Sequence, residues 1–263
     1  MIPWNLLLAG AAGACLLMAV LWLIQRRTGN AGIVDAGWAG GIGALAVIFA
    51  LGGAGDPTRR ALAGLLGGLW GFRLAWHLLT DRVLGKPEEG RYRALRAEWG
   101  RAAQRNLFLF FQAQALLVAF LSWPFLLAAS DRAPAWTFYD GGALALWGAG
   151  FALEAAADRE LRAFKADPAN RGRTCQRGLW GLSRHPNYFG EWLMWCAFAL
   201  LALGAPYGWS ALCAPAVLLF FILKVTGIPP TEAQALRSRG EEYRRYQETT
   251  SAFVPWFPRR PEP

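Results

Sequence analysis

Residues 33–52 read IVDAGWAGGIGALAVIFALG, a run of twenty residues with one charged side chain, Asp35. A helix that crosses the hydrocarbon core of a bilayer needs about 20 mostly apolar residues. Seven stretches of the chain qualify or nearly qualify: 4–24, 33–52, 61–79, 107–129, 141–157, 188–203 and 209–227. The sequence therefore predicts an all-α integral membrane protein with seven transmembrane helices. The fifth stretch is short, and we expect its helix to continue into the polar segment that follows.

The composition agrees with this class. Hydrophobic residues make up 55% of the chain and charged residues 17%, against about 45–50% and 25% in soluble domains. No cleavable signal peptide is expected, because residues 1–23 lack a positively charged start and their apolar run is too long. We interpret that run as the first span.

The Lys and Arg residues are distributed unequally along the chain. All but four of the 27 lie in segments 25–32, 80–106, 158–187 and 224–263. The exceptions are Arg59, Arg60, Arg73 and Arg132. Because cytoplasmic loops carry the excess of positive charge in membrane proteins, we predict an outside N-terminus and a cytoplasmic C-terminus. The net charge of +9 then attracts anionic lipid on one side of the membrane.

Several other classes of site are excluded by residue usage. The four cysteines form no CxxC pair and the chain has two histidines, so we expect neither a disulfide framework nor a metal centre. Nucleic acid is not expected as a partner, because no basic and aromatic platform exists apart from the spans.

Seven polar side chains lie inside or at the ends of the apolar stretches. They are Asp35, Arg73, His77, Glu154, Asn187, Glu191 and Lys224. A charged group at the centre of a span costs about 2.5–3.5 kcal/mol, and with the predicted orientation all seven lie toward the cytoplasmic ends of their helices. Snorkelling to the interface explains Lys224 and Arg73, but not the shorter side chains. The set predicts a shared polar cavity open to the cytoplasm.

One helix carries a charged stripe. Glu154, Asp158 and Arg162 follow one another at intervals of four residues, with Lys165 three further on. Residues at this spacing share a helix face. The stripe suits a charged cofactor lying along the helix; the alternative is a solvated face with ion pairs between successive turns.

Residues 182–191 read LSRHPNYFGE. The proline suits the first turn of a helix, whose free N–H groups favour an anion. Arg184 and His185 add hydrogen-bond donors at that point, and Asn187 and Glu191 share the next helix face. The motif predicts an anion-binding helix start with a carboxylate one turn deeper.

Longer motifs resemble a known family. RGLWGLSRHPNYFGEW at 177–192 and KVTGIPPTEAQALRSRGEEYRRYQETTSAFVPWFP at 224–258 resemble the C-terminal half of the steroid 5-alpha-reductase family. IVDAGW at 33–38 and RLAWHLLTDR at 73–82 are similar to its bacterial branch of seven-span proteins, within which the proteobacterial homologues are most similar. The resemblance covers nearly the whole chain.

The resemblance implies an NADPH-dependent reductase that acts on the carbon–carbon double bond of a 3-oxo-Δ4 steroid, with hydride added at C5 and a proton at C4. In the family, an acid on the second span and a tyrosine on the third polarise the 3-keto oxygen. Asp35 matches the acid, for which members outside the bacterial branch have Glu. The tyrosine has no counterpart in the third span, so we predict His77 in that role on its chemistry.

The remaining site residues follow from the resemblance and from the polar level described above. For the substrate we expect, beside Asp35, Trp38, Arg73 and Trp76. By motif, the NADPH residues are Asp158, Arg162, Lys165, Asn187, Glu191, Lys224, Tyr243 and Tyr246, to which the polar level and the loop motif add Glu154, Arg184 and His185. The loop that would meet the adenosine and its phosphates contains Arg82, Arg91, Tyr92 and Arg93. These arginines predict a preference for NADPH over NADH.

We expect a single seven-span domain over 1–263, with a substrate half at about 1–106 and a cofactor half at about 107–263. The expected partners are a steroid or another enone lipid and the surrounding membrane lipid, with no obligate protein partner. The expected location is the bacterial inner membrane, with the active site facing the cytoplasm.

Two alternatives come from other classes. Membrane methyltransferases acting on isoprenylcysteine or phospholipid, which use S-adenosylmethionine, share an RHPxYxG turn followed by a Glu–Glu pair. Here the equivalent stretch is IPPTEAQ, in which Glu232 follows Thr231, and the missing acid tells against a methyl donor. A transporter or lipid-binding protein is the second alternative. The polar residues gather at one membrane face and do not line a path across, which tells against it.

Overall fold

The computed structural model describes residues 2–259, and every regular element within them is helical. Five helical segments are long and apolar enough to cross a membrane: Trp4–Thr28, Ile33–Gly52, Pro57–Val83, Gly90–Ser130 and Gly208–Arg239. The prediction of an all-helical membrane protein is thereby confirmed. The number of seven spans and their orientation stay predictions.

Two further helices cover the remaining predicted spans. α7 (Phe138–Ala166) has 29 residues, and α9 (Pro186–Ala202) has 17. α7 continues from the apolar stretch into the polar residues that follow it, as the sequence predicted. α9 begins at the proline of the RHP motif, so the predicted helix start at that position is also confirmed.

The chain folds as two compact units. This division does not test the prediction of a single seven-span domain. The first unit comprises Met1–Asp140 and Leu201–Ala211. Its helices are α1 (Trp4–Thr28), α2 (Ile33–Gly52), α3 (Pro57–Leu78), α4 (Gly90–Trp99), α5 (Ala103–Leu121) and α6 (Trp123–Ser130). A π turn at Leu79–Val83 extends α3, and a 3-10 turn at Gly100–Ala102 joins α4 to α5.

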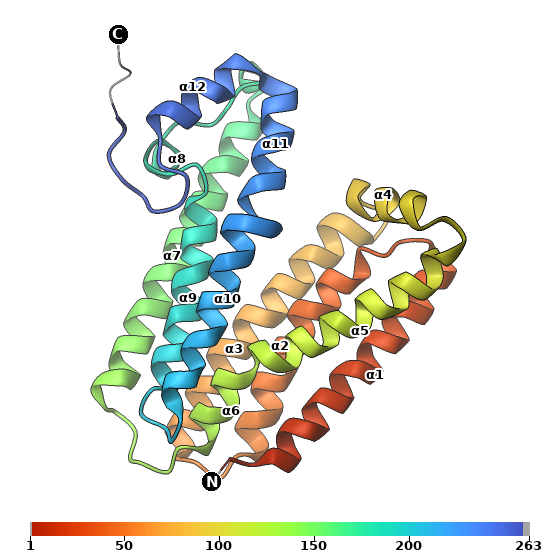
Figure 1. The fold of residues 1–263 in the computed structure, drawn as a ribbon. Coiled ribbons are helices and arrows are strands. Elements are labelled where there is room, and N and C mark those ends of the chain that lie inside the picture. Colours follow the sequence, from red (N-terminus) through yellow and green to blue (C-terminus); the bar gives the residue numbers. More distant parts are fainter. Residues whose placement is uncertain (1, 260–263) are drawn as a thin grey trace. The chain divides into compact units, whose positions relative to one another are not determined.

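Helices α2 and α3 form the most extensive helix pair of this unit, and Figure 1 shows them side by side. Their backbones meet at Gly43 and Gly71, where a Cβ atom added to Gly71 would lie 2.6 Å from Gly43 Cα. Such close approach of small residues is typical of helix packing in membranes, where the hydrophobic effect does not drive association. The glycines of the quoted second span therefore serve packing.

A buried ion-pair cluster lies at the start of α3. Arg59, which is 2% exposed, donates from Nε to Asp140 Oδ1 at 2.7 Å and from Nη1 to Asp131 Oδ2 at 2.5 Å. Its remaining N–H groups donate to the carbonyls of Ala133 and Pro134. All the hydrogen-bonding capacity of this cation is used within the protein, so we assign it a structural role.

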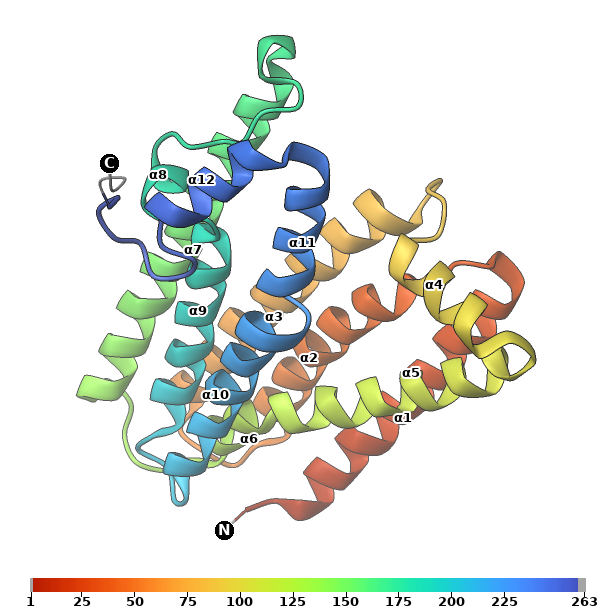
Figure 2. The same ribbon diagram turned by 45° about the horizontal axis from the view of Figure 1, so that its top comes forward.

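The second unit comprises Gly141–Leu200 and Leu212–Pro263. Its first part contains α7, a 3-10 turn (Pro168–Asn170), α8 (Leu179–Leu182) and α9. A 3-10 turn at Gly208–Leu212 leads into its second part, which contains α10 (Cys213–Phe220), a π turn (Phe221–Val225), α11 (Ile228–Arg239) and α12 (Glu241–Thr249). Helices α7 and α9 run side by side in both views (Figure 2). They meet at Gly150 and Gly190, where a Cβ on Gly190 would lie 2.7 Å from Gly150 O.

Candidate functional site

The first candidate centre is the Asp35 cluster, which we define as Asp35, Arg91 and Tyr92. Asp35 lies in the first turn of α2, and the other two open α4. The Tyr92 hydroxyl donates to Asp35 Oδ1 at 2.9 Å, and Arg91 Nη2 donates to Asp35 Oδ2. Tyr92 is 1% exposed, whereas the side chains of Asp35 and Arg91 are 23% and 42% exposed. The cluster thus has a buried side and an accessible one.

A second carboxylate holds α4 in place. Glu88 accepts the backbone N–H of Ala31 at 2.8 Å, just before α2 begins, and receives Arg96 Nε at 2.9–3.0 Å. Arg96 Nη2 in turn donates to Gln25 Oε1 at 2.7 Å. Because these contacts tie α4 to both α1 and the start of α2, the position of Tyr92 against Asp35 does not depend on the Asp35 contacts alone.

Three of the residues predicted for the substrate side lie on α3: Arg73, Trp76 and His77. His77 Nδ1 is 3.4 Å from Asp81 Oδ2, and the His77 side chain is 57% exposed. Trp76 is exposed and Arg73 is half-buried. Trp38 on α2 packs edge-on against Trp70, with 6.0 Å between ring centroids. The structure therefore brings Tyr92, and not His77, to the carboxylate of Asp35.

In the loop predicted to meet the adenosine and its phosphates, Glu89 lies beside two of the arginines. Arg82 Nη1 lies 3.6 Å from Glu89 Oε2, and Arg91 Nε lies 3.5 Å from Glu89 Oε1. Arg93 is exposed. The Arg82 and Arg91 side chains are 51% and 42% exposed, and ion pairs of such exposed arginines are weak enough to be exchanged for an anionic ligand.

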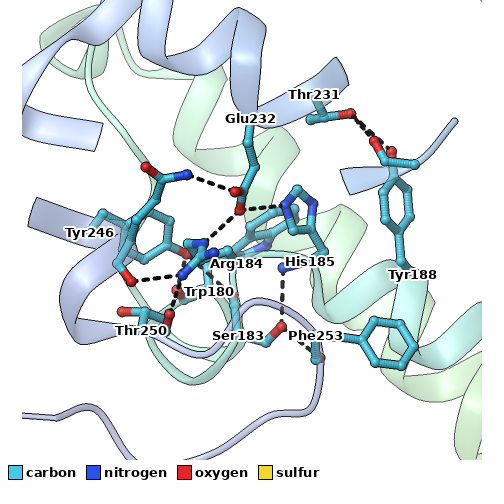
Figure 3. A network of polar contacts seen from close by, with 12 residues as sticks. Trp180, Ser183, Arg184, His185, Tyr188, Thr231, Glu232, Tyr246, Thr250 and Phe253 are labelled. Atoms are coloured by element: carbon cyan, nitrogen blue, oxygen red, sulfur yellow. Dashed lines mark hydrogen bonds and ion pairs between the residues drawn. The ribbon is translucent and has the colours of Figure 1, made fainter. Parts of the chain in front are cut away.

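The second centre is the Glu232 network, which we define as Arg184, His185, Glu232 and Gln247 (Figure 3). Glu232 Oε1 accepts from Arg184 Nε at 2.6 Å and lies 3.2 Å from His185 Nε2, and its Oε2 accepts from Gln247 Nε2 at 2.7 Å. Arg184 Nη1 also donates to the carbonyls of Gln247 and Thr250, at 2.9 and 2.5 Å. The Arg184 and Glu232 side chains are only 10% and 13% exposed.

The RHP turn therefore has an internal partner. The sequence predicted that Arg184 and His185 would donate to a bound anion; in the structure they surround the Glu232 carboxylate, which comes from α11. His185 is buried and stacks on Tyr188 with 5.2 Å between ring centroids. This network joins the start of α9 to α11 and to the end of α12.

Tyr243 and Tyr246 are part of the same internal structure. They are 4% and 2% exposed, and the Tyr246 hydroxyl donates to the carbonyls of Trp180 and Ser183. Burial and the nearby Glu232 carboxylate raise the pKa of Tyr243 to about 12. Both phenols thus stay neutral; Tyr246 holds α12 to the segment before the RHP turn, and Tyr243 packs with Ala235 of α11.

The polar stripe of α7 packs against α9 at Asp158 and at Glu154, which lies beside Gly190. Asn187 Nδ2 donates to Asp158 Oδ1 at 3.2 Å. Glu191 Oε1 accepts from Trp195 Nε1 at 3.1 Å, and Glu154 is 8% exposed. We call Asp158, Asn187 and Glu191 the amide–acid group.

Three predicted cofactor residues of this unit are exposed cations. They are Arg162, Lys165 and Lys224. Arg162 and Lys165 lie on α7 beyond Asp158, and Lys224 lies in the π turn after α10. Insertion of an extra residue in such a turn is frequent at functional sites, and Arg82 of the first unit lies in a π turn as well.

Tyr92 and Glu232 make more side-chain contacts in the structure than the sequence predicted for them. Tyr92 was placed in the nucleotide loop, and Glu232 was considered only as half of a missing acid pair. The sequence signals for these two residues were the arginines that flank Tyr92 in GRYR and the single acid in IPPTEAQ. Neither signal shows which side chain Tyr92 or Glu232 contacts.

No group of three or more His, Cys, Asp or Glu side chains able to hold a metal ion occurs within residues 2–259. The four cysteines are free thiols.

Comparison with known proteins identifies the family to which the chain belongs. No curated protein and no solved structure matches the chain. The model of one protein family, described as "Protein of unknown function (DUF1295)", matches residues 21–250. This family is related to steroid 5-alpha-reductase-like membrane proteins. Since the match covers most of the sequence, the chain belongs to the DUF1295 family of membrane proteins.

Proposed function

We propose that this protein is a membrane reductase that uses NADPH to saturate the C4–C5 double bond of a 3-oxo-Δ4 steroid or a related enone lipid. The observation that carries the proposal is the hydrogen bond from Tyr92 to Asp35. The resemblance implies an acid and a tyrosine acting together on the carbonyl oxygen, and Tyr92 supplies the phenol that could not be assigned from the third span.

The chemistry of the Asp35 cluster suits this role. Hydride addition to an enone develops negative charge on the carbonyl oxygen, and a fixed donor aimed at that oxygen lowers the barrier. Tyr92 is a buried phenol whose ring Arg91 covers, with the Arg91 guanidinium carbon 4.7 Å from the ring centroid. Asp35 orients the phenol, and Arg91 neutralises the carboxylate. The Asp35 side chain is 23% exposed, and the Tyr92 hydroxyl, which has one proton to donate, would turn from Asp35 Oδ1 to the carbonyl oxygen when the substrate binds.

The residues of the second unit fit a dinucleotide by their donor chemistry. NADPH would supply the hydride. Asp158 and Asn187 offer a carboxylate and an amide for ribose or nicotinamide groups, and the exposed cations Arg162 and Lys165 offer phosphate partners. Arginine is well suited to the 2′-phosphate that distinguishes NADPH from NADH. Arg184 and His185 are not needed for the cofactor, because Glu232 already uses their donors.

The proposal includes the membrane arrangement. The chain would cross the bacterial inner membrane seven times, with the N-terminus outside and the site facing the cytoplasm. Reporter fusions after residues 30, 95 and 170 should all report the cytoplasm, since the flanking segments carry the excess of basic residues. A periplasmic report from residue 95 or 170 would contradict this arrangement.

The activity is tested with the purified full-length chain in lipid nanodiscs. NADPH oxidation should require a 3-oxo-Δ4 steroid, should not occur with its saturated product, and should be slower with NADH. Mass spectrometry should show a product heavier by two hydrogens. Methyl transfer from S-adenosylmethionine to an isoprenylcysteine or phospholipid, without enone reduction, would support the methyltransferase alternative and refute the reductase.

A further inference from the structure

The segment after α12 exposes large apolar side chains although its backbone is held in place. Val254, Trp256 and Phe257 are 49%, 69% and 79% exposed. Trp256 N donates to Leu182 O at 2.9 Å, and Arg259 N donates to Thr249 O at 2.8 Å. A segment tied at both points presents these side chains in fixed positions, and exposed apolar groups in fixed positions mark an interaction surface.

The depth of this segment along α9 is set by Phe253. Its ring packs against Phe189 and Trp192, with 5.3 and 5.9 Å between ring centroids. Because a helix rises about 1.5 Å per residue, those residues lie roughly 5 and 9 Å beyond Pro186, where α9 begins. The segment thus runs beside the first two turns of α9, where its sequence becomes apolar.

A cavity of about 400 Å³ lies beside the same segment. Its polar wall includes the hydroxyl-bearing residues Thr249, Thr250 and Ser251, the cations Arg184 and Arg259 and one acid, Glu248, and its apolar wall includes Trp256. A cationic, hydroxyl-rich pocket next to exposed aromatic rings matches the two parts of a phospholipid, a phosphate headgroup and the start of its acyl chains. Tryptophan is enriched at this depth of membrane proteins, and arginine is attracted to anionic lipid.

We propose that residues 253–259 form a C-terminal anchor that binds an anionic phospholipid at the membrane surface. The phosphate would lie in the cavity beside Arg259, with Trp256 and Phe257 in the acyl-chain boundary. The inference rests on the proposal that α9 crosses the membrane, and it does not depend on the reductase activity.

The test uses the full-length chain in nanodiscs of phosphatidylethanolamine and phosphatidylglycerol. A small fraction of the lipid carries a photoactivatable diazirine near the glycerol end of its acyl chain, and labelled peptides are mapped by mass spectrometry. We expect label on the C-terminal anchor and on α9. Replacing phosphatidylglycerol by phosphatidylcholine should lower the label on the anchor several-fold and leave the label on α9 unchanged.

Variants sharpen the assignment. The double substitution Trp256→Ser and Phe257→Ser removes two exposed rings, so the fold should be kept while the label on the anchor falls several-fold. Arg259→Gln should weaken the dependence on phosphatidylglycerol. Arg244→Gln is the matched control, because the Arg244 side chain is 64% exposed on α12 and lies outside the cavity; it should label like the wild-type chain.

Each other result overturns the inference. Label on α9 without label on residues 253–259 would remove the C-terminal anchor and leave the seven-span proposal standing. Label on neither α9 nor residues 253–259 would contradict both the C-terminal anchor and the seven-span proposal. An anchor label that ignores the lipid headgroup and all three substitutions would show chance proximity. Protection of the segment from proteolysis by NADPH in detergent would assign the cavity to the nucleotide.

Discussion

The Asp35 cluster and the Glu232 network are built from the same kinds of side chain, yet they differ in how much hydrogen-bonding capacity remains for a ligand. Each centres on a carboxylate that receives an arginine and a ring group. The Glu232 carboxylate is 13% exposed and receives three side-chain donors, whereas the Asp35 carboxylate is 23% exposed beside an Arg91 that is 42% exposed. We therefore predict that the Glu232 network is structural and that the Asp35 cluster can exchange a partner for a ligand.

This comparison shows why residue type alone does not identify a site. Arg184 and His185 looked more like a ligand-binding pair in the sequence than Arg91 and Tyr92 did, because they stand together at a helix start. What decides between the two readings is whether a carboxylate from elsewhere in the fold, here Glu232, already uses the donors.

The largest effect is expected from Glu232→Ala. Removing one partner of a buried ion pair costs about 3–5 kcal/mol, because the remaining charge is left without a partner. Thermal unfolding in detergent should therefore begin at a clearly lower temperature, with early proteolysis after α12. Glu241→Ala is the control: its side chain is 72% exposed and pairs only with exposed Arg244, so a change within about 0.5 kcal/mol is expected. Equal unfolding of the two variants would mean that the Glu232 network is not structural.

The next effect is expected from Tyr92→Phe. The ring and its packing are kept and only the hydroxyl is lost, so unfolding should change little compared with Glu232→Ala. The rate of enone reduction should fall by about 10²-fold, the size expected when one donor to a developing oxyanion is removed. His77→Ala is the control, and it should keep most of the activity because His77 pairs with Asp81. Loss of activity in His77→Ala but not in Tyr92→Phe would assign the role of the family's tyrosine to His77, as the sequence predicted.

The smallest effect is expected from Asn187→Ala in the second unit. Loss of one hydrogen bond to a bound ligand costs about 1–3 kcal/mol, so NADPH affinity, measured by fluorescence titration, should fall by about 5- to 150-fold, and the fold should be kept. Glu191→Gln should act in the same direction. Wild-type affinity in both variants would make the amide–acid group part of α7–α9 packing only.

The sequence predicted the helices well because apolar length is a local property. The second span was predicted at 33–52 and is Ile33–Gly52. The fourth, predicted as 107–129 without interruption, is broken at Ser122, whose hydroxyl donates to Val118 O at 2.8 Å and which precedes Pro124 in α6. Hydropathy contains no signal for such a break, since both sides are equally apolar.

The site was predicted less completely because its contacts are distant in sequence. Asp35 and Tyr92 are 57 residues apart, and His185 and Glu232 are 47 apart. Spacing along one helix identified Asp158, Asn187 and Glu191 as candidates, and the structure joins the first two. Pairings between helices depend on packing that no periodicity expresses. The shared cavity predicted from the polar level joins residues of both units and stays a prediction.

The measurement that tests the central claim most directly compares steroid reduction and NADPH affinity in Asp35→Ala. The account predicts nearly unchanged NADPH affinity, with the rate of reduction lowered by about 10²–10³-fold, because Asp35 positions the Tyr92 phenol that donates to the carbonyl oxygen. Asp35→Glu should recover part of that rate, as the Glu of other family branches suggests. Full reduction by Asp35→Ala would contradict the account, and loss of NADPH affinity would move Asp35 to the nucleotide.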